Sequence, residues 1–112
     1  MTEVTIHKTK NGQILGLKLE GHSGYAPSGS DIVCASLSSL AQSVIVGMVE
    51  ILGLNVFNHI CDNPARLECY FAPAEIEGKE KEVSTLMSTF EKSVKYVAQD
   101  YPKYVIMIER EV

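Results

Sequence analysis

The segment that decides the fold, at residues 21–38, has the sequence Gly21-His22-Ser23-Gly24-Tyr25-Ala26-Pro27-Ser28-Gly29-Ser30-Asp31-Ile32-Val33-Cys34-Ala35-Ser36-Leu37-Ser38. Its first half is rich in glycine, proline and serine, which is typical of a loop. Ser30 or Asp31 then provides the N-cap of a helix, and apolar residues recur at helical spacing as far as residue 52. The segment therefore predicts a loop followed by a long helix at residues 31–52.

Cys34 lies near the start of this predicted helix. The unpaired N–H groups and the positive end of the helix dipole favour an anion there, so we expect a lowered thiol pKa. The same N–H groups are candidate donors to an oxyanion. Asp31, Cys34 and Ser38 are spaced i, i+3, i+7, which places all three on one stripe of the helix. This stripe can face a cleft.

His22 follows a strand-like segment at residues 14–20. A loop that brings its imidazole to the sulfur of Cys34 creates a nucleophile and its base. A histidine and a cysteine twelve positions apart also occur together without catalysis, so the spacing alone does not decide. The intervening loop has little to bury, and we expect it to be mobile; its residues are Ser23, Gly24, Tyr25, Ala26, Pro27, Ser28, Gly29 and Ser30.

Gly-His, a glycine-containing loop and Gly-x-Asp-Ile-Val-Cys-Ala-x-x-Ser at a helix start together resemble the ribosomal-processing cysteine protease family Prp of Gram-positive and related bacteria. The resemblance implies a homodimeric protease without a cofactor. Its implied substrate is the N-terminal extension of a large-subunit ribosomal protein, the bacterial protein numbered twenty-seven. By the same resemblance Cys34 is the nucleophile, His22 is the base, and Asp31 and Ser38 occupy supporting positions.

Two of these roles have alternatives. Asp31 either orients His22 as the third member of a triad or only caps the helix. Ser38 either bonds the substrate or the dyad, or is an ordinary serine on a half-exposed helix face. Tyr25 and Pro27 are candidates for closing over a bound peptide.

The rest of the chain predicts an α+β fold of order ββαββαβ, with a mostly antiparallel sheet and two long helices packed on it. Asn11-Gly12 predicts a type I′ hairpin between the first two strands. The last strand is a continuous apolar run, which favours a position with both faces covered or nearly so. The expected strands are residues 2–10, 14–20, 56–61, 65–72 and 104–109, and the expected helices are residues 31–52 and 79–100.

The composition describes one domain, residues 1–112. A net charge of −4 argues against nucleic acid as a direct partner, because phosphate binding needs clustered Lys and Arg. The start of the chain lacks the pattern of a signal peptide, and we expect no membrane span. Three cysteines, an odd number without metal-finger spacing, favour a reducing cytoplasm.

The sequence offers three candidate metal ligands, His59, Cys61 and Cys69, because His-x-Cys places two ligands on one strand face. Only three ligands are available, so buried small hydrophobes explain the two cysteines better, and we expect no metal site. Two other functions compete with the protease. One is a ribosome-associated protein, which needs a basic, aromatic sheet face. The other is a redox-sensing dimer with a reactive Cys34 but no peptide cleavage.

Overall fold

The computed structural model describes residues 1–27, 30–62 and 64–112. Over these residues five strands form one sheet in the order β3-β4-β2-β1-β5. The strands are β1 (Thr2–Lys8), β2 (Ile14–Glu20), β3 (Phe57–Asp62), β4 (Ala65–Tyr70) and β5 (Val105–Glu111). The pairs β1–β2, β2–β4 and β3–β4 are antiparallel, whereas β5 runs parallel to β1. The predicted mostly antiparallel sheet is confirmed.

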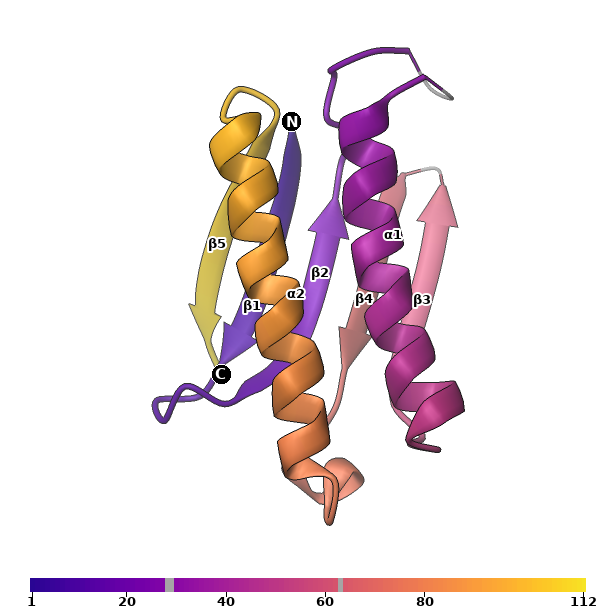
Figure 1. Cartoon of the computed structure of the whole chain (residues 1–112), viewed down its shortest axis with the longest axis vertical. Coiled ribbons are helices and arrows are strands. Elements are labelled where there is room, and N and C mark those ends of the chain that lie inside the picture. Colours follow the sequence, from indigo (N-terminus) through magenta and orange to yellow (C-terminus); the bar gives the residue numbers. More distant parts are fainter. Residues whose placement is uncertain (28–29, 63) are drawn as a thin grey trace.

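Two long helices lie side by side on one face of this sheet (Figure 1). They are α1 (Ile32–Val46), which continues into a π-helical turn at Gly47–Ile51, and α2 (Glu80–Asp100). The order along the chain is ββαββαβ, as the sequence predicts. Within residues 1–27, 30–62 and 64–112 no helix lies on the opposite face of the sheet (Figure 1).

The core lies between the sheet and the two helices. Alternation in the strands sends Val4, Ile6, Leu17 and Leu19 toward the helices, because residues that are two apart share a face. α2 meets them with the stripe predicted from its helical spacing, of which Val83, Met87, Phe90 and Val94 are buried. α1 contributes Val33, Leu37, Ala41, Val44 and Ile45. Local pattern and burial therefore agree.

The first hairpin forms, but its turn differs from the prediction. β1 ends at Lys8, and a longer turn follows in which Gly12 donates its N–H to the Thr9 carbonyl at 2.9 Å. Gly12 has a φ of +84°, and no residue other than glycine has a positive φ among the described residues. A type I′ turn requires positive φ at both central residues, so Asn11 does not form one. The register shift between His7 and Lys8 accommodates the longer turn.

The prediction that the last strand is covered on both faces is wrong. β5 is an edge strand, and of its seven residues only Val105 is buried. An apolar run does not separate a central strand from a parallel edge strand that packs one face under a helix. The other edge strand, β3, is also exposed along most of its length, including Phe57 and Ile60.

The ends of α1 follow the sequence closely. Asp31 is its N-cap, and Gly53, with a φ of +69°, provides the expected glycine after the helical segment. The helical segment Ile32–Ile51 is long and apolar enough to cross a membrane by length and composition. The core helix of a globular protein can have the same length and apolar composition. Five residues of α1 are buried against the sheet and α2. A short 3₁₀ helix, Pro73–Ile76, interrupts the segment before α2 and buries Ile76.

Candidate active site

The start of α1 is held by the carboxylate of Asp31. Its Oδ1 accepts the backbone N–H of Cys34 at 2.9 Å. The helix begins where the sequence predicts, and Asp31 is its cap. The N–H group of Cys34 is therefore occupied, and it is not free to bind an oxyanion in this arrangement.

The same carboxylate also holds the preceding loop. The hydroxyl of Ser23 donates to Oδ2 of Asp31. Burial raises the pKa of Asp31, but these donors together hold it below its usual value. Among the described residues no hydrogen bond joins Asp31 to His22. The structure thus displays the capping role of Asp31 and not a triad contact.

Cys34 is half-buried on the first turn of α1. Burial raises the pKa of its thiol, the nearby Asp31 carboxylate raises it further, and a backbone hydrogen bond from Ser23 lowers it only in part. The sequence-based expectation of a lowered pKa is therefore wrong for this arrangement. The first physical reason is burial of the thiol, which disfavours the thiolate, and the second is the negative charge that the cap residue brings to the helix start, where it opposes the dipole.

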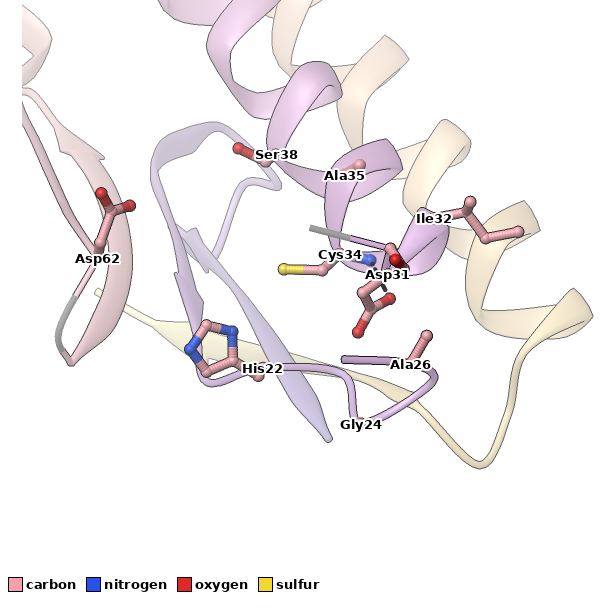
Figure 2. A pocket seen from close by; sticks show the side chains of 10 residues that line it. His22, Gly24, Ala26, Asp31, Ile32, Cys34, Ala35, Ser38 and Asp62 are labelled. Atoms are coloured by element: carbon pink, nitrogen blue, oxygen red, sulfur yellow. Dashed lines mark hydrogen bonds between the residues drawn. The ribbon is translucent and has the colours of Figure 1, made fainter. Parts of the chain in front are cut away.

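His22 is placed by the residue before it. Gly21 donates its N–H to the Ala65 carbonyl at 3.0 Å, and its own carbonyl accepts the Thr2 hydroxyl at 3.1 Å. Gly21 has a φ of +87°, and a Cβ at this position would lie 2.9 Å from the Met1 carbonyl oxygen. Only glycine fits this bend. The chain leaves β2 here and presents the His22 side chain, which is exposed, beside α1 (Figure 2).

His22 and Cys34 face one open cleft of about 510 Å³ (Figure 2). The cleft also includes Asp31 and Ser38, so all four residues singled out from the sequence meet at one place. No hydrogen bond links His22 to Cys34 among the described residues. Catalytic hydrogen bonds are commonly long without substrate, so this geometry is compatible with a dyad that closes on a bound peptide.

Ser38 stands one turn beyond Cys34 and is half-buried. Its Oγ accepts a hydrogen bond from Gln42 at 2.7 Å and faces the cleft. Asp62, at the end of β3, lies across from it (Figure 2). Sequence reasoning missed Asp62, because nothing in a single acidic residue beside a turn indicates that the β3–β4 hairpin reaches the cleft.

A smaller cavity of about 110 Å³ adjoins the cleft and again includes His22 and Cys34. Its floor is apolar and comes from three elements, β2, α1 and the β3–β4 hairpin, through Leu19, Leu37, Ile60 and Leu67. Strand alternation predicted the apolar faces of Leu19 and Leu67, and helical spacing predicted that of Leu37, but neither pattern indicated an opening next to the cysteine. An extended peptide lying across the cleft can place an apolar side chain here.

The described part of the predicted mobile loop is tied down at several points. Ser23 is buried, with 1% of its surface exposed, and its hydroxyl donates to Asp31. The ring of Tyr25 packs edge-on against Tyr101 and Tyr104, with centroids 5.5 and 5.3 Å apart. These contacts fix the arrangement described here, and movement of the loop over a peptide stays a prediction.

The structure also describes Gly24 and Ser30 of this loop. Gly24 has a φ of +78° and open space around it. The N–H of Ser30 donates to the Pro27 carbonyl at 2.9 Å. Ser28 and Gly29, also assigned to the mobile loop from the sequence, lie outside the described residues.

The three residues considered for a metal do not gather. Cys69 is fully buried on the helix side of the sheet, paired with Asn58, whereas His59 and Cys61 on β3 alternate to the other side. No group of three or more potential ligands was found over residues 1–27, 30–62 and 64–112. His59 and Cys61 share one face of β3, as the sequence predicts, but Cys69 points to the opposite face of the sheet.

A family model described as cysteine protease Prp matches residues 1–106. The chain belongs to this family. Family membership makes it a cysteine protease, and the cleft containing Cys34 and His22 is the candidate active site of a Prp family member. No curated protein matches the sequence.

Solved structures share the fold. The essential ribosomal processing protease Prp of Staphylococcus aureus, with a covalently linked product peptide, superposes with a TM-score of 0.86 at 17% identity, covering 98% of this chain and 100% of that one. The same protease with a substrate peptide gives 0.82 at 15% identity, with the same coverage of the two chains. The protein SMU.848 of Streptococcus mutans gives 0.84 at 22% identity, covering 100% and 96%.

Proposed function

We propose that this chain is an endopeptidase that removes the N-terminal extension of a bacterial large-subunit ribosomal protein, the one numbered twenty-seven, before ribosome assembly. The observation that carries the proposal is the meeting of Cys34 and His22 at one cleft, in a chain of the Prp family. The Staphylococcus aureus protein of this fold is a ribosomal processing protease seen with product and substrate peptides, which supports the substrate class.

The proposed reaction is acyl transfer in two steps. His22 accepts the thiol proton of Cys34 as the sulfur attacks the peptide carbonyl, so that a carbon–sulfur bond forms. The tetrahedral intermediate expels the amine, which receives the proton from His22, and a thioester remains on Cys34. Water then attacks the thioester with His22 again as base, releasing the carboxylate product and restoring the thiol.

The raised pKa of the Cys34 thiol explains why the reaction needs a proton transfer to His22. Because burial and Asp31 raise the pKa of Cys34, little thiolate exists at neutral pH before substrate binds. A base that takes the proton during attack is therefore needed. His22 lines the cleft alongside Cys34 and is the residue placed to act.

The substrate is tested with a peptide that spans the N-terminal extension junction of the ribosomal protein. Mass spectrometry should show a single cut by the unmodified protein and none by Cys34→Ala. A scrambled peptide of the same composition provides the control for sequence-specific cleavage. Cutting by the Cys34→Ala protein would rule out the proposed nucleophile.

Failure to cut has a distinct meaning when the thiol is still reactive. If neither protein cuts and iodoacetamide still modifies Cys34, the result favours a thiol sensor or a different peptide. A direct role in RNA binding has less support. The helix-free sheet face carries the aromatic residues Phe57 and Tyr70, stacked at 6.2 Å, but its charges include Glu20 paired with Arg66 at 2.5 Å and are mixed in sign.

We also propose that the protein forms a homodimer and that it acts in the cytoplasm. Large apolar side chains are exposed at the end of the α1 segment and on the helix side of β3: Val46, Val49, Ile51 and Ile60. A second copy that covers them would remove this apolar surface from water. The three cysteines are free thiols in the structure, which fits a reducing compartment. Sedimentation of the unmodified protein and of Val49→Glu tests the dimer, and the variant should be monomeric.

A further inference from the structure

Ser23 is a buried polar residue in a loop whose neighbours are exposed. Only 1% of its surface is accessible, whereas the flanking His22 and Gly24 are open to solvent. Its hydroxyl donates to Oδ2 of Asp31 and accepts the backbone N–H of Tyr25 at 3.2 Å. The burial and the two bonds make Ser23 the point at which this loop is fastened to α1.

The fastening uses the group that also caps the helix. Oδ1 of Asp31 takes the N–H of Cys34, and Oδ2 takes the hydroxyl of Ser23. One carboxylate therefore joins the residue that carries the nucleophile to the residue that directly follows His22.

We propose that Ser23 is a positioning residue of the protease: its bond to Asp31 holds the backbone that carries His22 against the turn that carries Cys34. This inference rests on the proposed function, because it assumes that His22 acts on Cys34. Ser23 itself acts on no reacting atom. Its bond to Asp31 restricts the positions that the imidazole of His22 can adopt.

Gly21 fixes the backbone on the N-terminal side of His22 through Ala65 and Thr2, but on the C-terminal side the loop offers little else to hold His22 near α1. Gly24 follows directly, with a positive φ and no atom near its missing side chain, and such a residue adds freedom to the chain. The ring of Tyr25 anchors the loop to Tyr101 and Tyr104, on the side away from the cleft. Displacement of a catalytic group by about 1 Å can lower the rate by about 10²-fold, so loss of the Ser23 bond should be visible in kcat.

The test compares Ser23→Ala with two matched variants. Ser36→Ala removes an exposed serine whose hydroxyl bonds only to its own helix, at the Ile32 carbonyl. Ser23→Thr keeps the hydroxyl. Cleavage of the junction peptide gives kcat and KM, and iodoacetamide modification of Cys34 from pH 6 to pH 10 gives a readout that needs no substrate. His22, Asp31 and Asp62 are the titratable groups of the cleft that face the sulfur, and Arg66 belongs to the adjoining cavity.

We expect Ser23→Ala to lower kcat about 10- to 100-fold with KM changed by less than about twofold. Its alkylation profile should match that of His22→Ala and differ from that of the unmodified protein. Ser36→Ala should behave like the unmodified protein, and Ser23→Thr should recover most of kcat. Asp31→Asn keeps an acceptor for Cys34 but loses one for Ser23, so adding Ser23→Ala to it should reduce kcat little further.

Several results would overturn the inference. One is a Ser23→Ala protein with normal kcat and an unchanged alkylation profile; another is a change confined to KM or to the melting temperature. If Ser23→Ala does not fold, kcat of Asp31→Asn decides, because an unchanged kcat in that variant contradicts the inference; its alkylation profile changes in any case, since the carboxylate charge beside Cys34 is lost. If the unmodified protein cuts no peptide, the proposed function fails while the alkylation comparison still decides Ser23: profiles shared with His22→Ala support it, and a profile equal to that of the unmodified protein overturns it.

Discussion

The two helices lie side by side on the sheet but begin in different ways (Figure 1). α1 begins with the Asp31 side chain, which bonds both its own first turn and the preceding loop. α2 begins at Lys79 without a hydrogen bond from a cap side chain, and its strongly one-sided stripe packs into the core. The first helix places chemical groups and the second supplies packing. Substitutions in the two should therefore separate activity from stability.

The largest expected effect falls on α1 and its loop. Cys34→Ala and His22→Ala should each lower kcat/KM for the junction peptide by at least about 10⁴-fold, because each removes a group that takes part in bond formation or proton transfer. Thermal unfolding should stay near that of the unmodified protein. His59→Ala, an exposed histidine on β3, is the matched control. Retained cleavage by either site variant would contradict the dyad.

The next largest effect concerns α2. Phe90 is 1% exposed and sits in the core under the helix, so Phe90→Ala should lower the free energy of unfolding by about 3–5 kcal/mol. Urea unfolding measures this change. Tyr96→Ala, on the same helix with its ring 66% exposed, should change stability by less than about 1 kcal/mol. Equal effects of the two substitutions would mean that the packing role of α2 is misassigned.

The alkylation rate of Cys34, in the cleft, should differ from that of Cys69, in the core. Because the pKa of Cys34 is raised above 9.0, its alkylation rate should climb about tenfold per pH unit through neutral pH and level off only in the alkaline range. Burial raises the pKa of Cys69 to about 12, and Cys69 should stay unmodified in the folded protein. Peptide mapping after timed iodoacetamide treatment measures both. A rate for Cys34 that is already maximal at pH 7 would contradict the charge arrangement around it.

The smallest effect is on the cap. Asp31→Ala should lower the free energy of unfolding at pH 7 by about 0.5–2 kcal/mol, as loss of an N-cap side chain does. The folded-state pKa of Asp31 lies below its usual 3.8, so its contribution is present above that pH and is lost as the pH falls through the folded value. The difference from the unmodified protein should therefore shrink between pH 5 and pH 2. Asp100→Ala, exposed at the end of α2, is the control.

Much of the fold follows from local pattern. Alternation predicted the faces of β1 and β2, helical spacing predicted the buried stripe of α2, and Asp31 and Gly53 predicted the ends of the α1 segment. The edge position of β5 did not follow. Its pairing with β1 is a contact between distant segments, and an apolar run contains no information about which strand lies beside it.

The sequence predicted that His22, Cys34 and two neighbours on α1 would lie together, which the cleft displays, but it did not predict the electrostatics around the thiol. Helix position alone suggested a lowered pKa for Cys34, because the dipole is a local property. The contribution of Asp31, the backbone bond from Ser23 and the burial depend on how the loop folds back. Ser23 was assigned to the mobile loop for the same reason: a serine in a glycine-rich segment carries no signal that it will be buried against the helix cap.

Pairing of the first strand with the last sets the order of events in folding. β1 and β5 align in parallel from Thr2 with Val105 to Lys8 with Glu111, across a sequence separation of about a hundred residues. During synthesis, β1 can pair with β2 early, but its other edge stays unpaired until the end of the described chain has emerged. Contacts of such long range form slowly, and an open strand edge invites pairing with other chains. Deletion of residues 105–112 should therefore shift the product from soluble protein toward aggregate, although every residue of the candidate active site remains present.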